Sequence, residues 1–280
     1  MMGLFAVTGA SGFIGQEVCR RLRDAGEDVI ALGRSGTGEG WGQWALGEPL
    51  PEACRAAGTV VHLASATLGV SGALRTAAIE TDVSGTRVLI EQLRGWRRGG
   101  SRHRLIFVSS QSARPEAVNA YGRSKWAIEQ LLAEDDEIVL RPGLVYSEPP
   151  QSVFAMFDKL SRLPALPAFD GPPSIQPVHV REVADAIVRA GAMKRPPRLL
   201  MLGAVAPLTF ADAIRATARR CGRRAPTMLP IPMQPVRLAA NLVDRMLGAT
   251  LTERLDGLAG LQPIDTAPSL AALDQTLASF

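Results

Sequence analysis

Cysteine is scarce in this chain, and its few cysteines are not arranged as a metal or disulfide site. The three are Cys19, Cys54 and Cys221; their number is odd, no two form a CxxC pair, and no histidine follows at the spacing of a zinc site. We therefore expect no metal centre and no disulfide framework, but free thiols in a reducing, cytoplasmic environment.

Long hydrophobic runs and an excess of one charge are also missing. No apolar stretch reaches the roughly 18 residues that a transmembrane helix needs, and no basic region precedes the first apolar run as in a signal peptide. Lysine and arginine number 31 against 27 aspartate and glutamate, and the short arginine clusters are not interleaved with aromatic residues. We expect a cytoplasmic protein that acts on a small molecule, with no integral membrane segment and no nucleic-acid partner.

Short apolar runs alternate with helical patterns through much of the chain. The runs are predicted as buried strands at residues 4–8, 28–32, 59–63, 104–109, 138–140 and 199–202, and the periodic patterns as helices at 13–25, 81–93, 121–133 and 183–190. Nearly all-apolar strands are typical of parallel sheets, which are covered on both faces. The order predicts βαβ units in a Rossmann-type α/β fold with a doubly wound parallel sheet.

Two proline-rich stretches interrupt this pattern in the second half of the chain. We expect residues 1–146 and about 178–205 to form a dinucleotide-binding core. Residues of about 147–177 and 206–280, with helical patterns at 152–163, 210–221 and 236–247, are expected to form a small C-terminal substrate-binding portion, folded as one unit. In open α/β sheets, ligands bind beyond the carboxyl ends of the strands, where such insertions form the walls of a pocket.

A glycine-rich loop follows the first predicted strand directly. The spacing is GxxGxxG, a variant of the dinucleotide fingerprint, and a helix begins inside it. Gly9 permits the tight turn, Gly12 lets the backbone approach a pyrophosphate, and Gly15 lets the helix pack closely on the sheet. Free amides at the helix start favour a diphosphate. The predicted cofactor-binding residues here are Gly9, Ser11, Gly12, Phe13, Ile14 and Gly15. No GK[ST] follows, so a P-loop nucleoside triphosphatase is not supported.

The residues at the end of the second predicted strand indicate whether the cofactor is NAD(H) or NADP(H). An NAD enzyme usually carries Asp or Glu there, which binds the ribose 2′-hydroxyl. This chain has Arg34 and Ser35 instead, and a guanidinium can pair with a 2′-phosphate. We therefore favour NADP(H) over NAD(H).

Tyr121 and Lys125 form a YxxxK pair at the start of a predicted helix. Residues four apart lie on one helix face, so the two side chains can act together. A nearby ammonium stabilises a phenolate, and we expect it to lower the pKa of Tyr121 so that the phenol can exchange a proton with a carbinol oxygen. Ser109 and Ser110 end a strand upstream and place hydroxyls where substrates bind.

Six segments that carry these residues occur in this order: Val7–Gly15, Val61–Ala64, Phe107–Ser110, Tyr121–Lys125, Leu140–Tyr146 and Pro177–Val180. Together they resemble the NAD(P)-dependent epimerase/dehydratase group of the short-chain dehydrogenase/reductase superfamily, of the extended or atypical type. The resemblance covers about residues 4–205.

The resemblance implies roles for particular residues. It makes Tyr121 the catalytic acid/base and Lys125 its partner, and it makes Ser110 the substrate-orienting hydroxyl, with Ser112 as the alternative. Residues implied to border the cofactor are Leu63, Ala64, Tyr121, Lys125, Pro142 and Gly143. The implied activity is hydride transfer to or from a carbonyl or carbinol substrate, for which a nucleotide-sugar is one candidate. The resemblance also implies a homodimer.

Two departures keep a second hypothesis open. Asp82 stands where the family usually has Asn, and the C-terminal portion is short for an enzyme that binds a whole nucleotide-sugar. The alternative is a non-catalytic NADPH-binding structural or regulatory module, like the atypical subunit attached to respiratory complex I. The retained Tyr121 and Lys125 favour an enzyme. Epimerase and reductase remain open, and a dehydratase is disfavoured because Gln111 replaces the expected acid.

Overall fold

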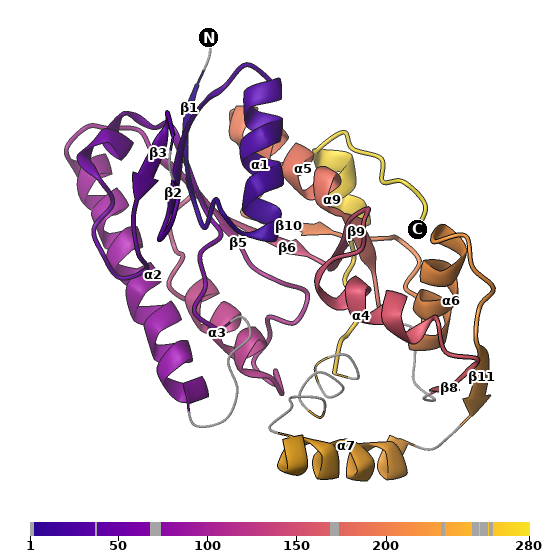
Figure 1. The fold of residues 1–280 in the computed structure, drawn as a ribbon. Coiled ribbons are helices and arrows are strands. Elements are labelled where there is room, and N and C mark those ends of the chain that lie inside the picture. The colour runs from indigo at the N-terminus through magenta and orange to yellow at the C-terminus, as the bar shows by residue number, and fades with distance from the viewer. Residues whose placement is uncertain are drawn as a thin grey trace.

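The computed structural model describes residues 3–36, 38–67, 74–168, 174–230, 233–247, 252, 257 and 260–280. A seven-stranded sheet runs through its centre in the order β10-β6-β5-β4-β1-β2-β3, and every neighbouring pair is parallel (Figure 1). The strands are β1 (Leu4–Thr8), β2 (Asp28–Gly33), β3 (Trp41–Gln43), β4 (Thr59–His62), β5 (Arg104–Val108), β6 (Glu137–Pro142) and β10 (Leu199–Leu202). The predicted Rossmann-type parallel sheet is confirmed.

Helices cover both faces of the sheet, and each face has its own apolar core. On one side α1 (Phe13–Asp24) packs beside α5 (Val180–Ala192), and on the other α2 (Leu74–Arg98) packs beside α3 (Ala120–Glu129). Side chains alternate along a strand, so in β5 Ile106 enters the first core while Leu105 and Phe107 enter the second. The apolar strands are therefore buried on both sides.

The strand order reverses beside β1. The chain moves from β1 outward to β2 and β3, and then returns to place β4 on the other side of β1. In doubly wound sheets this switch point, at the carboxyl ends of the strands, is where a ligand binds. The loop after β1 and the segment after β4 meet there, because a Cβ added at Gly9 would lie 2.8 Å from the amide nitrogen of Ala64.

The C-terminal portion has its own small apolar core. Phe154 and Phe157 from α4 (Ser152–Leu160) pack against Ile214 from α6 (Phe210–Arg220). Two short parallel strand pairs lie outside the central sheet: β7 (Leu144–Tyr146) with β9 (Pro177–His179), and β8 (Ala165–Ala168) with β11 (Thr227–Pro230), which connects the two segments of the C-terminal portion. The remaining elements are the short 3-10 helix η1 (Glu52–Ala56) and helices α7 (Met233–Leu247) and α9 (Ala267–Ala272). None of the helices in the described ranges is long and apolar enough to cross a membrane.

Several predicted helix boundaries were wrong. Helix α2 begins at least as early as Leu74 and continues through Gly95, where the prediction ended it. Gly95 is not among the glycines with positive φ, so the right-handed helical backbone continues through it. The helix ends instead just before Gly100, which has φ +92 and can take the left-handed conformation that terminates a helix. Helix α3 ends at Glu129 rather than at Ala133.

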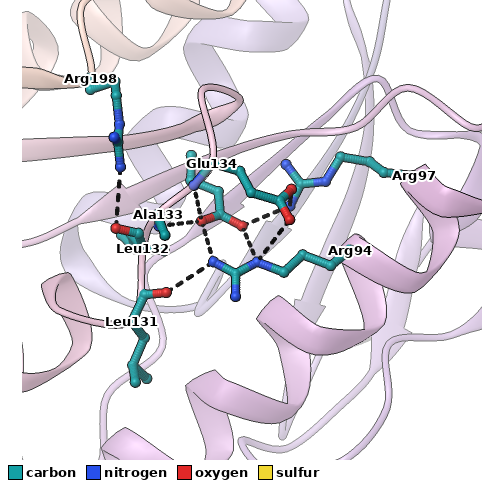
Figure 2. A network of polar contacts seen from close by, with 8 residues as sticks. Arg94, Arg97, Leu131, Leu132, Ala133, Glu134 and Arg198 are labelled. Carbon is teal, nitrogen blue, oxygen red and sulfur yellow. Dashed lines mark hydrogen bonds and ion pairs between the residues drawn. The ribbon is translucent and has the colours of Figure 1, made fainter.

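The buried carboxylate of Glu137 connects α2 to the start of β6 (Figure 2, in which its partners Arg94 and Arg97 are labelled). The Glu137 side chain is fully buried; the Arg94 Nη2 atom lies 2.6 Å from its Oε2, and the Arg97 Nη2 atom 2.7 Å from its Oε1. The backbone amides of Ala133 and Glu134 also donate to Glu137. Burial raises the pKa of Glu137, but the hydrogen bonds from Arg94 and these amides outweigh it and bring the pKa to about 2.

Candidate active site

The glycine motif that runs from the end of β1 into α1 requires glycine at two of its three glycine positions. Gly9 has φ +68, and a Cβ there would collide with the backbone of Ala64. A Cβ at Gly15 would lie 2.2 Å from the carbonyl oxygen of Gly9, so only glycine lets α1 pack this closely on the loop. Helix α1 has no side-chain cap and no acidic residue in its first turn. Its free amides form a cradle that suits a diphosphate.

The residues at the end of β2 gather beside this loop. Arg34 and Ser35 follow β2 directly, and both side chains are exposed. A Cβ built on Gly33, the last residue of β2, would lie 3.5 Å from the Oγ atom of Ser11. The end of β2 therefore brings Ser11, Arg34 and Ser35 toward one place, outside the lining of the main cavity.

One cavity of about 570 Å³ brings together most of the predicted site residues. Those that line it are Gly9, Gly12, Phe13, Ile14, Gly15, Leu63, Ser110, Tyr121, Lys125, Pro142 and Gly143. Ala64 lies just beyond the lining, where its backbone backs onto Gly9. The glycine loop and the YxxxK pair, more than 100 residues apart in sequence, thus face the same space.

Local features of α3 place Tyr121 in this cavity. Asn119 caps the helix, because its Oδ1 atom accepts a hydrogen bond from the Gly122 amide at 2.6 Å. A Cβ at Gly122 would lie 2.5 Å from the carbonyl oxygen of Ser112, so glycine is needed for α3 to approach the turn after β5. The first turn of α3, which carries Tyr121, is held against that turn.

Lys125 lies one helical turn beyond Tyr121 and is buried. Its Nζ atom donates a hydrogen bond to the carbonyl oxygen of Val108 at 3.0 Å. The same atom lies 4.7 Å from the centroid of the Phe107 ring and 5.6 Å from that of the Tyr121 ring. The hydrogen bond to Val108 therefore holds the ammonium next to the phenol ring of Tyr121.

The pKa of Tyr121 moves in the opposite direction to the prediction. Burial and the nearby charge of Asp82 raise it to about 12, although a hydrogen bond with Ser110 acts to lower it. Burial lowers the pKa of Lys125 to about 8, while Asp82 and Glu129 act to raise it. The expectation that the lysine would bring the tyrosine toward neutrality was wrong, because burial and a second charge dominate. At neutral pH the phenol is protonated and can donate a proton.

Two hydroxyls beside the phenol come from the turn after β5. The Ser110 and Ser112 Oγ atoms lie 2.8 Å apart, and the Ser112 amide donates to the Ser110 Oγ atom at 3.2 Å. Both residues line the cavity. Gln111, between them, is buried, and its side-chain amide donates to the carbonyl oxygens of Ser174 and Gln262, each at 2.7 Å. Gln111 therefore anchors two C-terminal segments.

Sequence reasoning missed several residues of this site. Ser65 and Thr67 line the cavity just after β4, and Asn119 lines it at the start of α3. The position of Ser65 and Thr67 directly after an apolar strand was a usable signal, since the carboxyl ends of parallel strands meet at one edge of the sheet. Asp82 on α2 accepts hydrogen bonds from both hydroxyls, at 2.8 Å from Ser65 and 2.7 Å from Thr67, and nothing in the sequence indicated these contacts.

His179 and Tyr146 lie outside the described lining of the main cavity. His179 caps α5: its ring accepts a hydrogen bond from the Arg181 amide, and Glu182 accepts one from the His179 amide. Tyr146 lies on a separate cavity of about 270 Å³, where its ring packs against Phe280. Within the described residues, no group of three or more His, Cys, Asp or Glu side chains is arranged to hold a metal ion.

Comparison with known proteins places this geometry in context. The model of a family described as NAD dependent epimerase/dehydratase matches residues 5–203. Over 301 residues, which cover 99% of this chain and 90% of that protein, the chain is 26% identical to a ceramide reductase of Caulobacter vibrioides. Over 206 residues, 66% of each protein, it is 31% identical to a probable dTDP-4,6-dihydroxy-2-methyloxan-3-one 4-ketoreductase of Streptomyces antibioticus.

A solved structure shares the fold over nearly the whole chain. It is the human epimerase family protein SDR39U1, isoform 2, with NADPH. The TM-score is 0.73, the identity is 18%, and the match covers 98% of this chain and 95% of that one. At this identity the likeness shows the fold alone.

Proposed function

The chain belongs to the NAD dependent epimerase/dehydratase family, and we propose that within it this protein is an NADP(H)-dependent reductase of carbonyl compounds with Tyr121 as the catalytic acid. Membership makes it an NAD(P)-dependent oxidoreductase or epimerase. The observation that carries the finer proposal is that Ser110, Tyr121 and Lys125 line the same cavity as the glycine loop. A proton donor and a dinucleotide cradle therefore face one substrate space.

The residues present fit a nicotinamide dinucleotide. Side chains at Gly9 and Gly15 would collide with the backbone, so the loop carries none at these positions and leaves room for a diphosphate. The uncapped amides of α1 face the same space. Lys125 is positioned to hold the ribose, and Pro142 and Gly143 border the cavity where the nicotinamide would lie. When bound, the cofactor supplies the hydride. Arg34 at the end of β2, where NAD enzymes carry a carboxylate, supports a 2′-phosphate and hence NADP(H).

The protein's own groups supply the proton and the polarisation. Ser110 donates a hydrogen bond to the substrate carbonyl oxygen and draws negative charge onto it. As hydride reaches the carbonyl carbon, the Tyr121 hydroxyl gives its proton to that oxygen, so the carbonyl becomes an alcohol and the tyrosine a phenolate. The Lys125 ammonium and the Ser110 hydroxyl then stabilise the phenolate until it takes a proton from water.

The cavity lining supports an apolar carbonyl substrate rather than a nucleotide-sugar. Beyond the catalytic residues and the glycine loop, the apolar part of the lining includes Leu144, Val145, Val153, Met156 and Leu261, and its polar part, which carries no charge, includes Ser65, Thr67, Ser109, Ser112, Asn119 and Ser152. Among the described residues of the lining, Lys125 is the one charged side chain, and it is already committed to the ribose. A second diphosphate would need further cations. The Caulobacter relative is named for a ceramide, and we propose a long-chain carbonyl compound here as well.

The test is NADPH-dependent reduction of straight-chain ketones of increasing length, with UDP-glucose as the nucleotide-sugar comparison. Each added methylene that enters the apolar lining should raise kcat/KM about fourfold, the equivalent of roughly 0.8 kcal/mol. The variant Tyr121→Phe should lose about 100-fold or more in kcat, because the proton donor is gone. Tyr146→Phe is the matched control, since the other tyrosine of the chain lies on the separate cavity.

An unchanged rate in Tyr121→Phe would refute the role of the phenol. Turnover of UDP-glucose with no response to ketone chain length would refute the substrate class and point to an epimerase. Tight NADPH binding without oxidation by any ketone or sugar nucleotide would favour the alternative, a non-catalytic NADPH-binding module. NADPH binding is followed by its fluorescence, and turnover by the loss of its absorbance.

A further inference from the structure

Trp41 is the first residue of β3, and its indole ring packs against the turn that follows β2. Strand β3 is at the edge of the central sheet and pairs with β2, with Trp41 opposite Ala31. The turn carries Ser35 and Arg34, the residue proposed to bind the 2′-phosphate of NADP(H). The Trp41 side chain is partly buried and packs on the apolar core that contains α1 and α5. One side chain therefore lies between this core and the turn.

The two glycines that flank Arg34 and Ser35 both contact this ring. A Cβ built on Gly33 would lie 3.2 Å from the Cζ2 atom of Trp41. A Cβ built on Gly36 would overlap the Cε2, Cζ2 and Nε1 atoms of the same indole. The ring therefore touches both ends of the turn, and it could not lie in this place if residue 36 carried a side chain.

Packing rather than a hydrogen bond holds the Trp41 ring in this position. Its Nε1 atom is buried and has no hydrogen-bond partner among the described residues. Trp44, three residues later, differs in this respect: it is 2% exposed, and its Nε1 atom donates to the Glu48 carbonyl oxygen at 2.9 Å. The position of the Trp41 ring thus depends on its fit to the core and to the two glycines, and the turn depends on the ring in return.

We propose that Trp41 is a positioning residue for coenzyme choice, whose indole supports the Arg34–Ser35 turn from Gly33 to Gly36 and holds it in the shape that receives a 2′-phosphate. An exposed turn with glycine at both ends would otherwise sample many backbone conformations. Support that exists before the coenzyme binds reduces the entropy that binding loses. The proposal rests on the proposed preference for NADP(H), because NADPH differs from NADH only by the 2′-phosphate.

The test measures binding and needs no turnover. NADPH and NADH affinities come from coenzyme fluorescence, and calorimetry with adenosine 2′,5′-bisphosphate probes the phosphorylated adenosine end alone. Trp41→Ala should weaken binding of NADPH and of the bisphosphate about 10-fold, part of the contribution of a hydrogen bond to a charged group, and leave NADH within about threefold. Trp44→Phe is the matched control: it changes the neighbouring buried tryptophan and should leave the ratio of NADPH to NADH affinity unchanged.

Gly36→Ala tests the contact between the turn and the ring. The added methyl group would overlap the indole, so the ring or the turn must move, and NADPH binding should weaken about 10-fold with little effect on NADH. The three atoms nearest to that methyl group all belong to the indole, so Trp41→Ala removes the collision. In the Trp41→Ala background, Gly36→Ala should therefore change NADPH affinity less than about twofold. Losses that multiply to about 100-fold in the double variant would show independent effects and would overturn the proposal.

The remaining outcomes separate this proposal from the proposed function. An unchanged ratio of NADPH to NADH affinity in Trp41→Ala would overturn the role of Trp41 and leave the proposed function standing. Equal losses for both coenzymes, with a lower midpoint in urea, would also overturn it, because they indicate a merely structural role. Wild-type protein that binds both coenzymes equally would sink the preference for NADP(H) and the role of Trp41 with it. If Trp41→Ala does not fold, Trp41→Leu, which fills part of the space, carries the same expectations.

Discussion

Arg34 is the residue on which the proposed preference for NADP(H) depends. Arg34 is exposed and directly follows Gly33 at the end of β2, and a Cβ on Gly33 would lie 3.5 Å from the Ser11 Oγ atom. We propose that the guanidinium of Arg34 meets a 2′-phosphate there. Replacing it as Arg34→Gln should weaken NADPH binding about 10- to 100-fold, the range of one hydrogen bond to a charged group, and leave NADH binding within about threefold. Fluorescence titration with each coenzyme measures both affinities.

The control for this substitution is Arg55→Gln, which removes another exposed arginine, on η1 and paired with Glu52. It should change neither affinity. Equal losses for NADPH and NADH in Arg34→Gln would contradict a contact with the 2′-phosphate and would place Arg34 near the shared part of the two coenzymes.

At the scale of single residues, sequence spacing predicted where a residue lies better than it predicted the pKa of its side chain. Gly9, Gly15 and Lys125 lie where their motifs put them, because a turn and one helical turn are local geometry. The direction of the Tyr121 pKa could not be predicted in this way. It depends on burial and on Asp82, which is 39 residues away in sequence and reaches the site only through the packing of α2 against α3.

At the scale of elements, the other six strands of the central sheet were predictable, whereas its edge strand β3 and the strands of the two small sheets were not. Strands β1, β4 and β5 are buried on both faces, so their composition alone indicates them. The unpredicted strands β3, β7, β8, β9 and β11 have three or four residues each, and three of them contain proline. Such segments become strands only because a partner strand lies beside them, which single-sequence patterns do not reveal.

The cluster around Glu137 holds α2 against the start of β6. Removing its charge as Glu137→Gln should lower the free energy of unfolding by about 3–5 kcal/mol, because Arg94 and Arg97 lose the partner that balances their partly buried charges. Urea unfolding measures the change. Glu134→Gln is the matched control: this carboxylate pairs with the same two arginines but is 46% exposed, so its loss should cost less than about 1 kcal/mol.

The pH dependence of unfolding gives the same prediction a second measurement. The pKa of Glu137 falls from 4.5 to about 2 on folding. Its stabilisation is therefore complete above pH 4.5 and is lost as the pH falls toward 2. The difference in unfolding free energy between wild type and Glu137→Gln should shrink by about 1.4 kcal/mol per pH unit across that window. A difference that stays constant from pH 5 to pH 3 would contradict the pairing as the source of stability.

At the scale of the whole molecule, the last residues of the chain return to the part that is predicted to bind the dinucleotide. Gln111 donates to the Gln262 carbonyl oxygen, and Gln176 accepts from the Ile264 amide at 2.7 Å. Helix α9 packs on the edge strand β10, and Gln275 donates to the carbonyl oxygen of Glu182 on α5. The contacts of Gln111, α9 and Gln275 join residues of the predicted C-terminal portion to the rest of the chain, and the contact between Gln176 and Ile264 joins the two segments of that portion. We propose that the core and the C-terminal portion fold and unfold as a single unit.

The distribution of tryptophan allows a direct test of that unity. All four tryptophans, Trp41, Trp44, Trp96 and Trp126, lie in the core, so their fluorescence reports the core alone. Far-UV circular dichroism also reports α4, α6 and α7 of the C-terminal portion. We expect the two signals to give the same midpoint and slope in urea, and saturating NADPH to move both midpoints upward together, because a ligand of the native state stabilises every part that unfolds with it. A dichroism transition at lower urea, with tryptophan fluorescence unchanged and no response to NADPH, would show that the substrate-binding portion unfolds on its own.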